Sequence, residues 1–444
     1  MVNINIDYSE KLGKIKPMHG VGQPPMYAHL TNYMHYLSDA GIPYSRLHDV
    51  GGEQGGNRFV DIPNIFRNFD ADVNDPDSYD FAFTDLIIEA LMKEKCEPIF
   101  RLGVSIENAF FIKRYRTVPP ADFDKWARIC EHIIRHYNEG WANGFNFGIK
   151  YWEIWNEPDN VYNGKLESDN PMWAGTKEEY YKLYSTTAKH LKNCFGDSIK
   201  VGGYASCGFY AVTNYPGNYG FDGRTGTDKD IRSLYFVDYF KDFFKYIKEN
   251  NVPIDFFSWH SYAPTKDTSI MTDYCVRSLE EFGYGDIETH LNEWNNASER
   301  ENMGSPLAAA RYASMMCMQQ NKKTNILNFY DARLGTSRYG GLFNPITLNP
   351  FPAYFSFVAF NELYKLGTQV KCDVSEGDLY AIASTDGENK ALLIANETDK
   401  DVEIQLNGMD IKEMYIIDSE HTYEKIDNIK EINKIGKETV ILLK

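Results

Sequence analysis

The sequence predicts an α/β protein in which a (β/α)₈ TIM barrel is followed by a small C-terminal β-sandwich. Between residues 18 and 330, short runs rich in strand-forming residues alternate with segments of helical spacing eight times. From about Leu366 onward, the pattern changes to short alternating strands separated by Gly, Asp and Asn. The repeated alternation indicates a parallel sheet covered by helices, and eight strands are what a closed barrel requires.

The expected barrel strands lie at Met18–Gly22, Pro43–His48, Glu97–Gly103, Gly148–Asn156, Ser198–Tyr204, Ile254–His260, Asp286–Glu293 and Thr324–Tyr330. Helical spacing is clearest at Asp122–Tyr137, Lys177–Cys194, Val237–Asn250 and Pro306–Gln320. A doubly wound open sheet would alternate in the same way, so periodicity alone leaves that architecture open.

Two domains are expected, a catalytic barrel over 8–365 and an accessory β-sandwich over 366–444. The strands of the second domain are expected at Leu379–Ala383, Lys390–Ala395, Val402–Leu406, Met414–Asp418 and Glu438–Leu443. Asn3–Asp7 is also strand-like, so residues 1–7 are assigned to the sandwich as well. Three Gly- or aromatic-rich loops follow barrel strands and would surround the active face, at Val50–Val60, Phe110–Pro119 and Asn214–Lys229.

The composition excludes several classes of partner. A formal net charge of −17 speaks against nucleic acid and against an anionic membrane surface, because both require clustered Lys and Arg. No segment approaches the roughly 20 apolar residues of a membrane span. The seven cysteines are scattered and contain no C-x-x-C pair, which indicates reduced thiols. Because the N-terminus also shows no signal-peptide pattern, we expect a cytoplasmic protein.

The sharpest local feature is the segment 151–158, with the sequence YWEIWNEP. Pro158 cannot continue a strand ladder, so the fourth strand should stop there and leave Glu157 at its carboxyl end. Barrel enzymes carry their catalytic groups at that end of the strands.

A second carboxylate ends the seventh strand, where residues 290–295 read HLNEWN and contain Glu293. Carboxyl groups from strands 4 and 7 would face each other across the barrel mouth. Hydrolysis of a glycosidic bond requires such a pair, and in a retaining enzyme the two lie about 5–5.5 Å apart. Their proximity would push their pKa values in opposite directions.

These residues resemble glycoside hydrolase family 39 of clan A, whose members include β-xylosidases and α-L-iduronidases. The resemblance covers most of residues 18–365. It is most specific at 152–158 (WEIWNEP) and 252–260 (VPIDFFSWH), and weaker at 45–48 and 341–354. It implies that Glu157 is the general acid/base and Glu293 the nucleophile, in a double displacement without metal or cofactor.

Further predicted substrate-binding residues come partly from the resemblance. It implies that Asn156 hydrogen-bonds the sugar 2-hydroxyl and that His48 binds sugar. Arg46 would end the second strand beside the nucleophile and hold it ionised, since a nearby cation lowers a carboxylate pKa. His260 and Tyr262 end the sixth strand, where a tyrosine hydroxyl could donate to Glu293 and orient it.

Glu153 shares the strand parity of Glu157 and should point into the barrel. It is therefore interpreted as a structural hydrogen-bond partner of Arg46 or Arg101 rather than as a catalytic acid.

The sugar itself is left open by two departures from the xylosidase pattern. Trp294 follows the nucleophile where a Tyr is typical, and the eighth strand ends at Tyr330 where the family's xylosidases carry a Trp that lines the sugar pocket. Both are predicted to contact substrate. Arg333 and Arg338 would meet a carboxylated sugar or pair with surface acids. The leading hypothesis is a β-xylosidase acting on plant-type oligosaccharides, with an arabinosidase, an iduronidase-like or an oligosaccharide-specific enzyme as alternatives.

Two functions other than glycoside hydrolysis are also considered for this chain. A carbohydrate-binding barrel that has lost catalysis would not need an intact carboxylate pair. An aldolase or a metal-dependent isomerase would need a Schiff-base Lys or a metal cluster at the strand ends, and the sequence suggests neither. A homo-oligomer is compatible with the sequence.

Overall fold

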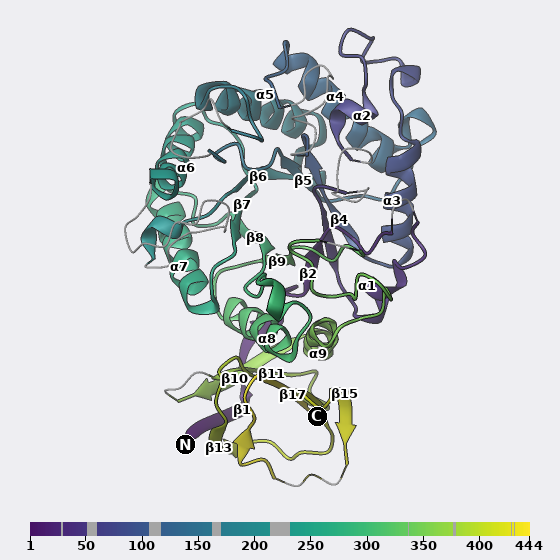
Figure 1. Ribbon diagram of the computed structural model, residues 1–444. Helices are drawn as coiled ribbons and strands as arrows, with labels where there is room; N and C mark the ends of the chain where they lie inside the picture. The colour runs from purple at the N-terminus through teal and green to yellow at the C-terminus, as the bar shows by residue number, and fades with distance from the viewer. Residues whose placement is uncertain are drawn as a thin grey trace.

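The computed structural model describes residues 1–27, 30–50, 60–105, 117–161, 170–213, 231–335, 337–375, 379–427, 429 and 431–444. Within these residues, β2 to β9 form a closed barrel in which every neighbouring pair of strands is parallel (Figure 1). The predicted (β/α)₈ barrel is confirmed, and the open-sheet alternative is wrong.

Each barrel strand overlaps a segment expected from the sequence. The strands are β2 (Gly20–Gly22), β3 (Tyr44–Leu47), β4 (Glu97–Leu102), β5 (Tyr151–Ile154), β6 (Lys200–Ser206), β7 (Phe256–Ser261), β8 (Glu288–Trp294) and β9 (Ile326–Phe329). They are buried almost throughout, as expected for parallel strands covered on both faces. The three expected rim loops fall largely on 51–59, 106–116 and 214–230, which lie outside the described residues.

The helices of the described residues surround the strands (Figure 1). They are α1 (His35–Asp39), α2 (Ile62–Ile65), α3 (Ala82–Lys93), α4 (Phe123–Glu139), α5 (Lys177–Phe195), α6 (Ile231–Glu249), α7 (Thr265–Phe282), α8 (Pro306–Gln320) and α9 (Pro352–Leu366). Short 3₁₀ turns occur at Pro76–Ser78, Trp141–Asn143, Gly196–Ser198, Tyr210–Val212 and Arg300–Asn302. Side-chain caps define three of the described α-helix starts, including that of α8, where the Ser305 hydroxyl accepts from the backbone N–H of Ala308. The Asp122 carboxylate accepts from the backbone N–H of Lys125, and Thr176 with Glu179 forms a capping box.

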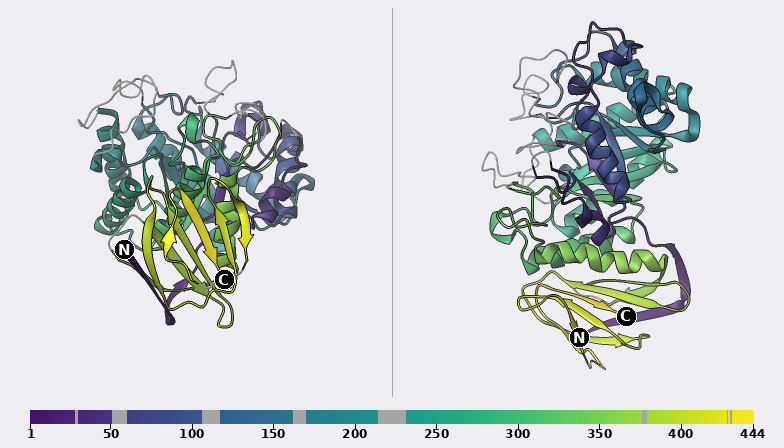
Figure 2. Two further views of the ribbon diagram at one scale, coloured as in Figure 1. Left: turned by 60° about the horizontal axis from the view of Figure 1, so that its bottom comes forward. Right: turned by 90° about the vertical axis from the view of Figure 1, so that its right-hand side faces the viewer.

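The second domain is built on a sheet of nine described strands in the order β15-β14-β17-β12-β11-β10-β1-β13-β16. They are β1 (Val2–Lys14), β10 (Thr368–Val374), β11 (Leu379–Thr385), β12 (Lys390–Asn396), β13 (Val402–Asn407), β14 (Met414–Ile417), β15 (Thr422–Ile426), β16 (Lys434–Ile435) and β17 (Thr439–Leu443). Hydrogen bonds join them in one sheet, which curls over its own apolar side chains (Figure 2). β1 lies between β10 and β13, so the N-terminal segment is part of this sheet.

The sheet packs against α8 and α9, which lie between it and the barrel (Figure 2). Helix α8 is buried on nearly all sides, because the barrel covers one face and β11, β12 and β17 cover another. Its small residues Ala308, Ala309, Ala310 and Ala313 allow this close approach.

All seven cysteines lie in the described residues and are free thiols. Among the described helices, none combines the length and the apolar character that a membrane crossing requires.

The sheet offers a stability test on β1. Ile4 is fully buried and pairs with Val374 and Leu406, whereas Ile346 is 89% exposed in a loop. Ile4→Ala is expected to lower the free energy of unfolding by about 2–5 kcal/mol, because it leaves a cavity in the core of the sheet. The matched variant Ile346→Ala should change it by less than about 0.5 kcal/mol. Urea denaturation followed by circular dichroism measures both. Equal effects would contradict the assignment of β1 to this core.

Candidate active site

Glu157 and Glu293 meet at the carboxyl ends of the barrel strands. Glu157 lies just after β5, and Glu293 lies near the end of β8, where it is in register with His260 of β7. The Nδ1 atom of His260 lies 2.7 Å from Oε1 of Glu157 and 3.4 Å from Oε2 of Glu293. One side-chain atom of each of the three residues falls within 4.8 Å of the others. The two predicted catalytic carboxylates are thus brought together at one rim of the barrel.

Arg46 of β3 organises the floor of this site. Its guanidinium is fully buried and donates to three groups, from Nε to Glu153 (2.7 Å), from Nη1 to Glu293 (2.7 Å) and from Nη2 to Asn156 (2.6 Å). A buried positive charge is stable only beside a negative one, and Glu153 supplies part of that negative charge for Arg46. The other oxygen of Glu153 accepts from Ser258 and Asn292. Glu153 is therefore a structural partner of Arg46, one of the two arginines named from the sequence.

His260 and Tyr262 hold the two carboxylates from the side of β7. A carboxylate only accepts hydrogen bonds, so Nδ1 of His260 carries the proton in its 2.7 Å bond to Glu157. Asn160 donates to the second oxygen of Glu157 at 2.7 Å. The Tyr262 hydroxyl donates to Oε2 of Glu293 at 2.8 Å, which is the contact that the sequence suggested.

Burial and the neighbouring charges together shift the pKa values of Glu157 and Glu293 in opposite directions. Burial raises the pKa of Glu157, but the hydrogen bond and charge of His260 outweigh burial and hold the pKa of this carboxyl below its ordinary value. Burial keeps the pKa of Glu293 above its ordinary value, against the opposing charges of His260 and Arg46. As predicted, the charge of Arg46 lowers the pKa of Glu293, but burial raises this pKa by more than Arg46 lowers it.

His260 completes this unit. Burial lowers its pKa, but the neighbouring Glu293 and Glu157 outweigh burial and hold the pKa of His260 above its ordinary value. The three groups are close enough to exchange protons and therefore titrate together rather than singly.

The backbone turns sharply where these side chains leave their strands. Glu157 has φ 46°, Trp155 has φ 74° and Asp49 has φ 54°, all in the left-handed region that non-glycine residues rarely adopt. Such conformations cost about 1–3 kcal/mol each and persist where the surrounding structure enforces them. Their concentration at one rim of the barrel is typical of a functional site.

Two further predicted substrate-binding residues lie in a second polar group beside Glu293. Nε2 of His48 lies 3.2 Å from Oδ1 of Asp49. The Tyr330 hydroxyl donates to Oδ2 of Asp49 at 2.9 Å and accepts from Gln23 at 2.7 Å. Burial, followed by the charges of Arg101 and Arg46, holds the pKa of His48 well below its ordinary value, so this imidazole is neutral.

Trp294 does not join the site. Its ring lies 5.7 Å from Tyr312 of α8 and 5.4 Å from Phe329, centroid to centroid, and it is fully buried. Since successive strand residues point to opposite faces, the inward position of Glu293 sends Trp294 toward the helices. The structure thus gives Trp294 a packing role and does not bring it to the carboxylates.

Two buried acids near the site were missed by sequence reasoning, Asp49 and Asp159. Asp49 follows His48 directly, and that adjacency was its only signal. Asp159 follows the YWEIWNEP segment and accepts from the Ser206 hydroxyl and the Cys207 N–H. Burial raises the pKa of each to about 7.

Among the described residues, two groups of three side chains lie close enough together to hold a metal ion. One group is the unit of Glu157, His260 and Glu293, and the other is Glu131, His190 and Cys194 on α4 and α5. In the second group, the Glu131 carboxylate already accepts from Arg135 at 2.8 Å and contacts His190 at 2.6 Å. A guanidinium at that distance opposes a metal cation.

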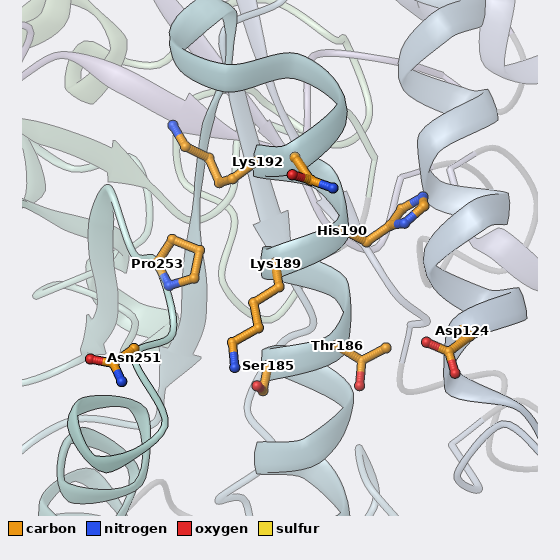
Figure 3. Close-up of a pocket in the computed structure, with 9 residues that line it drawn as sticks. Asp124, Ser185, Thr186, Lys189, His190, Lys192, Asn251 and Pro253 are labelled. Atoms are coloured by element: carbon orange, nitrogen blue, oxygen red, sulfur yellow. The ribbon is translucent and has the colours of Figure 1, made fainter.

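A separate polar pocket of about 800 Å³ runs along α5, between it and the segment that precedes β7 (Figure 3). Lys189, His190 and Lys192 line it together with Asn251 and Pro253, and no predicted site residue does. This pocket is therefore distinct from the carboxylate site.

Comparison with known protein families identifies the family of this chain. The profile described as "Glycosyl hydrolases family 39" matches residues 2–282. The chain belongs to this family. Two curated relatives are similar to this family 39 chain. A "Beta-xylosidase" of Geobacillus stearothermophilus is 27% identical over 241 residues, and one of Caldicellulosiruptor saccharolyticus is 26% identical over 281. The matches cover 51% and 59% of this chain but 39% and 46% of the relatives, so the chain matches less than half of each relative's length.

Solved structures share the fold of this family 39 protein over its whole length. A glucosidase from Croceicoccus marinus superposes on 100% of this chain and 98% of its own, with a TM-score of 0.78 at 19% identity. A monomeric beta-xylosidase from Caulobacter crescentus CB15 covers 99% of this chain and 98% of its own, with a TM-score of 0.69 at 14% identity. At these identities the likeness establishes the barrel and its accompanying sheet.

Asp159 generates a prediction about stability and pH. Its pKa is about 7 in the folded protein against an ordinary value of 3.8. Between these pH values the folded state holds a proton that the unfolded state has lost, so this group's contribution to stability falls as pH rises, and it levels off above pH 7. Relative to Asp159→Asn, the wild type should lose stability by up to about 1.4 kcal/mol per pH unit in this window. Urea titrations of both proteins from pH 4.5 to 8 measure the difference, and a difference that is independent of pH would contradict it.

Proposed function

We propose that this family 39 protein is a retaining glycoside hydrolase, with Glu157 as acid/base and Glu293 as nucleophile, and that a β-xyloside is its substrate. The observation that carries the proposal is the convergence of both carboxylates on one histidine, with side-chain atoms within 4.8 Å of one another. The named relatives support the choice of sugar, since both are called beta-xylosidases.

In the first step, Glu157 gives a proton to the glycosidic oxygen while Glu293 attacks the anomeric carbon, so that the leaving group departs and a glycosyl-enzyme forms. The proton has a source in the site, because His260 already donates to Glu157 at 2.7 Å. When a sugar displaces water from the site, the loss of solvation favours neutral Glu157 and neutral imidazole over the ion pair. Transfer of that one proton prepares the acid.

Arg46 and Tyr262 prepare the nucleophile. Their hydrogen bonds occupy one oxygen of Glu293 each, at 2.7 and 2.8 Å, and stabilise the charge that the attack requires. In the second step, Glu157 accepts a proton from a water molecule, the water attacks the anomeric carbon, and the bond to Glu293 breaks. The sugar leaves with its original anomeric configuration.

The alternatives to a β-xyloside remain an α-L-arabinoside, an iduronide-like or a longer oligosaccharide substrate, and a barrel that binds sugar without cutting it. The cytoplasmic location and a homo-oligomer also stay predictions.

Substitution of each carboxylate tests the mechanism on a panel of p-nitrophenyl glycosides. Glu157→Ala is expected to lower kcat/KM by about 10²–10⁴-fold, the usual contribution of acid/base catalysis. The loss should be smaller for a 2,4-dinitrophenyl glycoside, whose leaving group needs little protonation, and azide should restore turnover with a glycosyl azide of retained configuration. Glu293→Ala should be at least about a thousandfold slower on every leaving group.

The buried Glu153→Gln serves as the comparison. It disturbs the same Arg46 network, but azide should not restore its activity. Wild-type-like rates in both Glu157→Ala and Glu293→Ala would overturn the proposed mechanism, and so would identical leaving-group dependence in the two variants.

Tyr262→Phe separates orientation from chemistry. It removes one hydrogen bond to Glu293 and leaves the ring in contact with Tyr339, 4.9 Å between centroids. A fall in kcat of about 10-fold or more is expected, because hydrogen bonds to charged groups contribute about 1.5–3 kcal/mol. Steady-state kinetics on the best panel substrate gives the answer, and an unchanged kcat would remove Tyr262 from the mechanism.

A further inference from the structure

Asp49 occupies a position for which the fold has no evident need. It lies two residues beyond the end of β3 and three beyond Arg46, with the left-handed backbone described above. Tyr330, at the end of β9, donates to Oδ2 of Asp49 at 2.9 Å, and Gln23 supports that tyrosine from the end of β2. Residues at the ends of three adjacent strands therefore hold this carboxyl at the rim.

The other oxygen of Asp49 is unsatisfied. Oδ1 is buried and accepts no hydrogen bond from the described residues, although His48 Nε2 lies 3.2 Å away. A buried acceptor without a donor costs about 1–3 kcal/mol, so such groups in native proteins call for an explanation. Burial, followed by the charge of Glu293, raises the pKa of Asp49 to about 7.

The exposure of the Asp49 side chain is close to that of Glu293, whereas the acids that compensate buried arginines are fully buried. The Asp49 side chain keeps 9% of its surface exposed and Glu293 keeps 6%. Glu153 and Asp61, which compensate buried arginines, have none. The Asp49 side chain is thus slightly exposed, as the side chain of the nucleophile is.

The arginines near His48 each contact an acid. Three arginines act on the charge of His48, and each contacts a carboxylate, although Nε and Nη1 of the fully buried Arg101 make no hydrogen bond to the described residues. Arg46 contacts Glu153 and Glu293, Arg101 contacts Asp61 at 2.6 Å, and Arg333 contacts Asp331 at 2.9 Å. A sugar carboxylate placed beside Asp49 and Glu293 would therefore add a further negative charge without a new cation to balance it.

We propose that Asp49 is a specificity residue that accepts hydrogen bonds from the hydroxyl groups of an uncharged sugar and discriminates against uronic acids. This inference rests on the proposed glycosidase function and narrows its substrate class to neutral glycosides. Above its pKa of about 7, Asp49 is an ionised carboxylate, which only accepts hydrogen bonds and can take several donors, as adjacent sugar hydroxyls require. Tyr330 fixes its orientation, and His48 is neutral and adds no charge to attract an anion.

The test compares kcat/KM for the best neutral p-nitrophenyl glycoside with that for p-nitrophenyl β-D-glucuronide, in the wild type and in Asp49→Asn. Asparagine keeps the shape and an acceptor for Tyr330 but lacks the charge. The neutral substrate should lose about tenfold or more, mainly through KM, while the glucuronide loses less or gains. The ratio of the two kcat/KM values should therefore fall about tenfold. Proportional losses on both substrates would indicate a merely structural role and overturn the proposal.

Asp159→Asn is the matched control. Asp159 is a fully buried acid whose pKa is also about 7, but its oxygens accept hydrogen bonds from Ser206 and Cys207. Its substitution should leave the ratio of neutral to uronide kcat/KM unchanged. A change equal to that of Asp49→Asn would show that any lost charge near the site alters the ratio, and would also overturn the proposal.

A binding experiment tests the role of Asp49 independently of whether the protein hydrolyses glycosides. Calorimetric titration of the intact wild-type chain with D-xylose, D-glucose and D-glucuronate needs no turnover. Neutral sugars should bind more tightly than glucuronate, and Asp49→Asn should weaken them about tenfold. If no glycoside is hydrolysed but this pattern holds, the hydrolase proposal fails and the role of Asp49 stands. If neutral sugars do not bind, or bind equally to both proteins, the role of Asp49 is wrong.

Discussion

The guanidinium of Arg46 is the interaction on which the rest of the site depends. It is fully buried on β3 and reaches Glu153 and Asn156, at and just beyond β5, and Glu293 on β8. A buried charge must be compensated, so the three partners are held wherever this cation lies. The same fork orients the nucleophile and the asparagine beside the acid/base, and it does so before any substrate arrives. Removing one partner would leave an unbalanced charge in the barrel floor.

The second constraint is the excess of acid at the rim. Glu157, Glu293, Asp49 and Asp159 influence one another through a poorly solvated interior, where electrostatic effects are stronger than in water. Part of the charge is relieved by protons, on His260 and on the two aspartates whose pKa is about 7. The site is thus set up to hold and move protons, which general acid/base chemistry requires, at some expense in stability.

Much of this arrangement was predictable from the sequence, for physical reasons. Each barrel strand lies in a short β-rich run, and Pro158 marks the end of β5, so the placement of Glu157 and Glu293 at one rim followed from topology. Strand parity predicts that Glu153 points inward, and by the same parity Trp294, which directly follows Glu293, points to the helices. The sequence did not predict β10, β15 and β16. Thr368–Val374 continues directly from helix α9, β15 is largely exposed and polar, and β16 is only two residues long. The role of Asp49 could not be predicted, because the local sequence reveals neither its left-handed backbone conformation nor its unpaired oxygen.

The position of β1 has a consequence for the order in which the chain folds. Val2 pairs with Ile404 and Ile4 pairs with Val374, so a strand that is synthesised before the barrel is hydrogen-bonded to strands that are synthesised after it. Contacts this distant in sequence require closure of a very long loop and form late. While the ribosome is still making the barrel, β1 has no neighbours, and its alternating apolar side chains are a vulnerable edge for association with other chains. Once β10 and β13 have been made, completion of the sheet would join the segments that precede and follow a barrel that has already formed.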